Sequence, residues 1–126
     1  MPGRRRVVKQ VDLNSISALS RRQKPDFVLL LEDGEVLVVE ETGRPELKDL
    51  NRLEAFLRWA RRGGWGHLLA FRPELVMCVV HYRKRDLAFA RMAEHKARAL
   101  AKLGGKLKLV SCEREFKERL GVLWAR

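Results

Sequence analysis

Two apolar runs joined by a short polar turn constrain the fold of this chain most. Phe27–Leu31 and Val36–Val39 are built from Leu and Val apart from the first residue, and Asp33-Gly34 lies between them. An Asp-Gly pair between two such runs is among the strongest short signals for a β-hairpin. Neither run alternates between apolar and polar residues, which is typical of strands covered on both faces. The hairpin therefore predicts an α/β structure with helices on both sides of its sheet.

The rest of the chain alternates helix and strand signals. Its 126 residues suit one domain spanning 1–126, in which residues 1–6 form a mobile basic tail. Helical spacing of leucines, capping residues and Gly-Gly stops set most boundaries. The further expected elements are a strand at Val7–Leu13, a short helix from Asn14 or Ser15 to Arg22, a helix from Pro45 to Arg62, a strand at Leu75–Val80, a helix that starts after Asp86 and stops at Gly104-Gly105, a strand at Leu107–Val110 and a helix from Glu113 to about Leu123. Together they predict an α/β fold with a mixed central sheet of four or five strands flanked by helices.

The charge balance points to a polyanionic partner. The chain has 27 Lys and Arg against 16 Asp and Glu, a formal net charge of +11. Such an excess favours nucleic acid, although charge alone does not separate it from a ribosome, a membrane surface or plain solubility. No apolar run approaches the ~18 residues that a membrane span needs, and no apolar segment of a secretory signal follows the basic start. We therefore expect a cytoplasmic protein.

The two cysteines have little to do with function on this interpretation. Cys78 and Cys112 lie in apolar stretches and are too few for a disulfide scaffold or a four-ligand zinc site. We expect both to be small, buried core residues.

Two acids at the open end of the hairpin are the main candidates for chemistry. Asp26 precedes the first strand and Glu40 follows the second. If the loop is Asp33-Gly34 alone, the two acids point to opposite sides of the sheet. If Glu32–Gly34 form a three-residue loop with a left-handed glycine, Asp26 lies directly opposite Glu40. The sequence allows both registers.

The second register predicts a cation site. Two carboxylates about 5 Å apart at Cβ repel each other unless a cation or a proton is shared between them. Oxygen ligands suit Mg²⁺ or Mn²⁺, and such an ion would support hydrolysis of a phosphodiester bond. The cationic side chains Arg21, Arg22 and Lys24 lie close by in sequence and would hold backbone phosphates.

The same residues resemble the PD-(D/E)xK nuclease superfamily, which includes archaeal Holliday-junction resolvases and restriction-endonuclease-like proteins. The resemblance rests on Pro25-Asp26, the Asp33-Gly34 turn and the strand that ends in Glu40-Glu41-Thr42, and it covers Lys24 to Tyr82. It implies a restriction-endonuclease-like core, a divalent-metal-dependent DNA endonuclease with structure-selective cleavage as one option, Asp26 and Glu40 as metal ligands, and a homodimer.

Thr42 departs from that pattern, because the superfamily has a lysine there. Lys24, opposite Thr42 in the second register, and Lys48, in the first turn of the following helix, are the candidate replacements for that catalytic lysine. The alternative is a catalytically inactive protein of the same fold that binds DNA or serves as a scaffold in a complex.

Six basic residues are the candidates for contact with nucleic acid: Arg21, Arg22, Arg44, Arg83, Lys84 and Arg85. For Arg44, pairing with Glu41 or Glu46 is the alternative. Glu41 points away from Glu40 on a strand, so we expect it to be solvated or salt-bridged. His81 ends a buried strand, and we expect a structural, hydrogen-bonded residue there.

Overall fold

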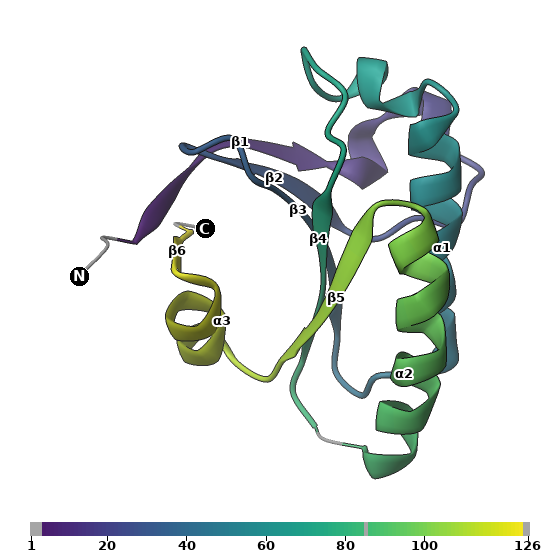
Figure 1. The fold of residues 1–126 in the computed structure, drawn as a ribbon, viewed down its shortest axis with the longest axis vertical. Helices are drawn as coiled ribbons and strands as arrows, with labels where there is room; N and C mark the ends of the chain where they lie inside the picture. Colours follow the sequence, from purple (N-terminus) through teal and green to yellow (C-terminus); the bar gives the residue numbers. More distant parts are fainter. Residues whose placement is uncertain (1–3, 85, 125–126) are drawn as a thin grey trace.

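In the computed structural model, which describes residues 4–84 and 86–124, six strands form one curled mixed sheet in the order β5-β4-β3-β2-β1-β6 (Figure 1). The elements are β1 (Arg5–Asp12), the 3₁₀ turns η1 (Leu13–Ser15) and η2 (Ser17–Leu19), β2 (Phe27–Leu31), β3 (Val36–Thr42), α1 (Leu47–Arg61), the 3₁₀ turn η3 (Gly64–His67), β4 (Val76–Tyr82), α2 (Leu87–Lys102), β5 (Gly105–Val110), α3 (Glu113–Leu120) and β6 (Val122–Leu123).

Helices cover both faces of the sheet, as the apolar strands predict. α1 and α2 pack side by side on one face, and α3 lies on the other, inside the curl (Figure 1). Successive residues of the hairpin serve the two faces in turn: Val28 and Val38 join the cluster under α1 and α2, whereas Leu29 and Leu37 join the cluster under α3. The predicted α/β class with helices on both faces is confirmed.

The sheet has six strands, whereas four or five were expected. α3 ends at Leu120 instead of continuing to Leu123, because Gly121 takes a left-handed conformation (φ 61°) that stops the helix. The chain then turns back, and Val122–Leu123 pairs in parallel with Arg5 and Arg6 of β1. A two-residue strand carries no periodic pattern that sequence analysis could detect.

The expected mobile tail at residues 1–6 is wrong for the part that the structure describes. Arg5 and Arg6 belong to β1, and Arg5 forms ion pairs with Asp33 and Glu35 across the sheet. Residues 1–3 lie outside the described part of the chain.

The short helix expected up to Arg22 is also wrong, since two 3₁₀ turns, η1 and η2, take its place. Asp12, rather than Asn14 or Ser15, caps the first of them, with its Oδ1 accepting the Asn14 N–H at 2.9 Å.

Local capping sets the ends of the two long helices. α1 begins at Leu47 rather than Pro45, because Glu46 and Asp49 form a capping box at its start. α2 begins directly after its cap Asp86, as predicted, with the Asp86 Oδ1 accepting the Ala88 N–H at 2.9 Å. The start of α1 matters for function, because it fixes where Asp49 lies.

The hairpin takes the three-residue loop. Leu31 donates its N–H to the Glu35 carbonyl at 2.9 Å, and the strands pair up to Phe27 opposite Val39. Gly34 has a φ of 91°, in the left-handed region where an L side chain is strained. This is the register in which Asp26 comes opposite Glu40 instead of pointing to the other side of the sheet, and the charge of Asp26 acts on Glu40.

The two cysteines differ in solvent exposure. Cys78 is fully buried in the core, as expected, but Cys112 is exposed. Cys112 is exposed because β5 ends before it, at Val110. It caps α3 instead, with its Sγ accepting the Glu115 N–H at 3.4 Å. No helix among residues 4–84 and 86–124 is long and apolar enough to cross a bilayer.

Candidate functional site

Asp26 binds the backbone of the neighbouring strand. Its own N–H donates to the Val39 carbonyl at 2.9 Å, and its Oδ2 accepts the Glu41 N–H at 2.7 Å. The carboxylate therefore closes the open end of the hairpin, where the ladder between β2 and β3 ends. One of its oxygens is already used in the fold.

Glu40 is held by an arginine that the sequence analysis did not single out. The Arg52 Nη1 lies 2.9 Å from the Glu40 Oε2, and the Glu40 side chain is only 1% exposed. Arg52 projects from α1, whose N-terminal half packs over the end of β3, and its own side chain is 40% exposed. A hydrogen bond from a charged guanidinium to the oxygen of a buried carboxyl group is strong by protein standards, because its donor is ionised.

Asp49 is a second buried carboxylate beside this pair. Its side chain is 1% exposed, its Oδ2 accepts the Glu46 N–H at 2.8 Å, and its Oδ1 lies 3.6 Å from the Arg52 Nη1. Within the described part of the chain, that Oδ1 has no hydrogen-bond partner. The Asp49 side chain also forms a hydrogen bond with that of Glu40, which two carboxyl groups can make only when one of them keeps its proton.

Both aspartates act on the carboxyl group of Glu40. Burial, followed by a hydrogen bond with the Asp49 side chain, raises the pKa of Glu40 to about 9, and the charge of Asp26 adds to the effect while Arg52 opposes it. The bond to Glu40 in turn raises the pKa of Arg52 above its ordinary value. Glu40 therefore carries a proton at neutral pH in this arrangement.

The cation predicted for this site is Mg²⁺ or Mn²⁺. The carboxylates have the right chemistry for such an ion. However, residues 4–84 and 86–124 contain no group of three or more His, Cys, Asp or Glu side chains placed to hold a metal ion. Arg52 binds Glu40, and Asp26 binds a backbone amide. As arranged, these residues do not fit the ion, and the metal site stays a prediction.

The two lysines expected to replace the lysine that the resemblance implies form their contacts away from Glu40. The Lys24 Nζ donates to the Leu19 carbonyl at 3.1 Å, and the Lys48 Nζ lies 3.3 Å from the Glu46 Oε2. Thr42, at the lysine position, donates its hydroxyl to the Arg44 carbonyl at 3.1 Å. The cation beside Glu40 is Arg52.

Sequence reasoning missed Asp49 and Arg52, although one signal was present. Asp49 lies at helical spacing from Leu53, Phe56 and Ala60, which are all buried, so a carboxylate occupies a core position of α1. An acid on the apolar stripe of a helix needs a partner, and that partner is a candidate for the site. The identity of Arg52 as that partner depends on how α1 packs on β3.

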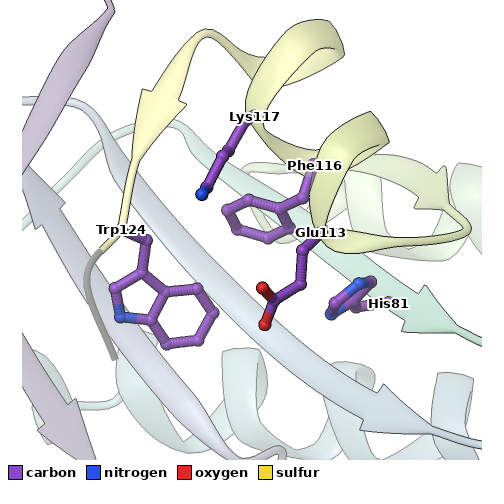
Figure 2. A pocket seen from close by; sticks show the side chains of 5 residues that line it. All are labelled: His81, Glu113, Phe116, Lys117 and Trp124. Carbon is purple, nitrogen blue, oxygen red and sulfur yellow. The ribbon is translucent and has the colours of Figure 1, made fainter.

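Glu41 points to the opposite face of the sheet and contacts His81. The Glu41 Oε2 lies 3.2 Å from the His81 Nδ1, so both expectations for these residues are confirmed. Figure 2 shows His81 below α3, with the Glu113 side chain between its ring and that of Trp124. The pocket among them holds about 10 Å³, room for about one water molecule.

A wider groove of about 630 Å³ opens at the carboxyl ends of the parallel strands β3, β4 and β5, with Glu41, His81 and the exposed Cys112 in its walls. Ligands of open α/β sheets often bind at such ends. The mixed acidic and basic lining favours no single class of ligand.

The predicted nucleic-acid contacts divide into three groups. Arg44 forms an ion pair with Asp86 at 3.4 Å, rather than with Glu41 or Glu46. Arg21, Arg22, Arg83 and Lys84 are exposed. Arg85 lies outside the described residues.

No protein-family model, no curated protein and no solved structure matches this chain.

Proposed function

We propose that this protein binds the backbone of DNA with its basic surface, and that it does so without a metal ion and without cutting. The observation that carries the proposal is the bond between Arg52 and Glu40. The resemblance requires a glutamate that binds a metal and a lysine that assists a water molecule. In this chain the glutamate, Glu40, is bound to Arg52, and a threonine, Thr42, stands in place of the lysine.

The electrostatics support this interpretation. A guanidinium bound to the Glu40 Oε2 competes with any cation for that oxygen, and a carboxyl that keeps its proton at neutral pH is a poor metal ligand. The order of β2, β3, α1 and β4 is the order that the resemblance implies, and Thr42 stands where the resemblance implies a lysine.

The cationic surface supports DNA as the partner. The net charge is +11, and the exposed Arg21, Arg22, Arg83 and Lys84 have no ion-pair partner among residues 4–84 and 86–124. Uncompensated Lys and Arg side chains displace counterions from phosphates, which gives affinity without sequence preference.

The salt dependence of binding tests this proposal. We expect a labelled duplex or branched DNA to bind in EDTA, with the logarithm of the affinity falling linearly with the logarithm of the salt concentration. Exchange of Arg83 and Lys84 together for Gln should lower the slope by about 2. Arg114→Gln is the control, because Arg114 is already paired with Glu118. Absence of binding at about 50 mM salt, or a slope that the double variant leaves unchanged, would overturn the proposal.

A second candidate function is divalent-metal-dependent cleavage of DNA, with Asp26 and Glu40 as ligands of Mg²⁺ or Mn²⁺. The buried side chains of Asp49 and Glu40 lie next to each other, which favours it, because clustered carboxyl groups can be stabilised by a cation as well as by a shared proton. This function needs Arg52 to release Glu40.

A cleavage assay separates the two functions. With Mn²⁺, the first proposal expects wild-type protein to leave duplex and branched DNA intact. Cleavage that is lost in both Asp26→Asn and Glu40→Gln, while both variants keep the wild-type circular dichroism spectrum, would replace the first proposal by the second.

A homodimer and a scaffold in a larger complex are the two proposals for protein partners. Sedimentation that shifts with protein concentration supports a homodimer. The same shift in a protein that binds no DNA supports a scaffold instead.

A further inference from the structure

A groove at the C-terminal end of α1 combines positive charge with stacked aromatic rings. It has a volume of about 500 Å³ and lies where the segment between β1 and β2 passes along α1 (Figure 1). The lining residues that matter are Arg22, Arg58, Trp59, Arg62, Gly64 and His67. The sequence analysis assigned His67 no role.

The loop that carries Arg22 is fixed in place. Leu19 anchors it in the core with no exposed surface, and the Arg22 N–H donates to the Leu19 carbonyl at 3.0 Å. Lys24, once a candidate for the catalytic site, donates its Nζ to the same carbonyl. The Arg22 side chain therefore starts from an ordered backbone beside α1.

The aromatic wall is equally ordered. The ring of Trp59 lies 5.8 Å from that of Phe56 and 5.9 Å from that of His67, and the planes of Trp59 and His67 are only 26° apart. Gly64 makes this packing possible, because a Cβ there would come within 2.5 Å of the Trp59 Cε3. His67 is the exposed ring of the stack.

Two of the three arginines are uncompensated. Arg58 pairs with Glu54 at 3.0 Å, whereas no ion pair of Arg22 or Arg62 occurs in the part of the chain that the structure describes. A groove with two unneutralised cations beside an exposed ring suits a ligand that has both phosphates and flat bases.

One face of α1 links the groove to the carboxylate site. Arg52, Ala55, Trp59 and Arg62 follow one another at spacings of three or four residues, so they share one face of α1. Arg52 binds Glu40 at one end of this stripe, and Arg62 lies in the groove at the other, about 15 Å away along the helix axis.

We infer that this groove binds a single-stranded nucleic acid, with phosphates on Arg22 and Arg62 and an unpaired base stacked on His67. The inference rests on the proposed function and names its ligand more closely. Duplex DNA cannot supply the base, because its bases are already stacked on one another. A strand in this groove would run along α1 toward Arg52.

The test compares two labelled strands of equal length in EDTA, an oligo-dT and the same backbone without bases. Wild-type protein should bind the oligo-dT at least about fivefold more tightly, since stacking of one base on an aromatic side chain gives an effect of that order or larger. His67→Ala should remove this preference and leave the affinity for the abasic strand unchanged. His95→Ala is the matched control, an exposed histidine on α2 outside the groove.

The arginines supply an independent readout. Arg22→Gln and Arg62→Gln should each lower the salt slope for oligo-dT by about 0.7, whereas Arg91→Gln on the exposed side of α2 should not. These substitutions lie on the surface, so a change in slope cannot be ascribed to loss of the fold.

The results distinguish failure of this inference from failure of the proposed function, binding of the DNA backbone. Equal affinity for the two strands, or no effect of His67→Ala and Arg22→Gln, overturns the inference about the groove. If duplex DNA still binds with the expected salt dependence, the proposed function is retained. If neither duplex nor single strands bind, both are overturned.

Discussion

The guanidinium of Arg52 lies 2.9 Å from the carboxyl group of Glu40, which has almost no exposed surface. The two residues belong to different elements, α1 and β3, so their bond joins a helix to the centre of the sheet. It also determines what the site can do, because the same oxygen is the one that a metal ion would need.

Removal of Arg52 should destabilise the protein more than removal of a similar surface arginine. Arg52→Ala leaves Glu40 buried without its donor, and the loss of a hydrogen bond to a charged group costs about 1.5–3 kcal/mol. Arg58→Ala removes an i,i+4 pair with Glu54, which keeps its bond to Lys96, and about 0.3–0.5 kcal/mol is expected for such a pair. Urea denaturation gives both free energies of unfolding. Equal losses would mean that the Arg52–Glu40 bond adds no stability.

The pKa of Glu40 predicts a dependence of stability on pH. Between pH 4.5 and about 9 the unfolded chain loses the proton of this carboxyl while the folded chain keeps it. Folding therefore binds a proton in this window, and the free energy of unfolding should fall as the pH rises, by at most about 1.4 kcal/mol per pH unit.

Glu40→Gln isolates this contribution, because the amide keeps an acceptor for Arg52 and does not titrate. The stability of wild-type protein relative to Glu40→Gln should decrease from pH 5 to pH 9 in urea denaturation. A difference that stays constant or increases over this range would show that the carboxyl is ionised in the folded state.

Gly34 should be intolerant of a side chain although there is space for one. A Cβ at Gly34 meets no atom within 4 Å, so only its φ of 91° resists the change. Gly34→Ala should cost about 1–2 kcal/mol of stability. Gly43→Ala is the control, since its surroundings are equally open and its φ is not in the left-handed region. If both substitutions cost the same in thermal or urea denaturation, the three-residue loop is wrong.

The two thiols should differ in reactivity. Burial raises the pKa of Cys78 to about 12, and its side chain is inaccessible, whereas Cys112 is exposed at the start of α3. A thiol reagent such as Ellman's reagent should titrate one cysteine in the native protein and two in denaturant. Cys112→Ser should leave the native protein without fast-reacting thiol, and a fast reaction in that variant would show that Cys78 is accessible.

Local signals predicted most elements of the fold. The Asp33-Gly34 turn, the apolar runs on each side of it and the cap at Asp86 all act within a few residues, so the sequence alone indicates them. The register of the hairpin could not be predicted, because the sequence Glu32-Asp33-Gly34 is compatible with a two-residue loop and with a three-residue loop. β6 also escaped prediction, because its two residues pair with the distant start of β1.

The site was harder to predict than the fold. Asp26 and Glu40 were selected because they flank the hairpin, and the structure does bring them to the same end. Their hydrogen-bond partners depend on long-range packing: the Glu41 amide reaches Asp26 across the hairpin, and α1 delivers Arg52 to Glu40. Cys112 was misjudged for a similar reason, since apolar neighbours in sequence do not show where a strand ends.

The most direct test of the central claim measures the binding of one labelled branched DNA by fluorescence anisotropy, first in EDTA and then in Mn²⁺, at the same ionic strength. If Arg52 has taken the place of a metal at Glu40, the two titrations should give the same dissociation constant and the DNA should be recovered intact. Binding that requires Mn²⁺, or DNA recovered as fragments, would contradict the account.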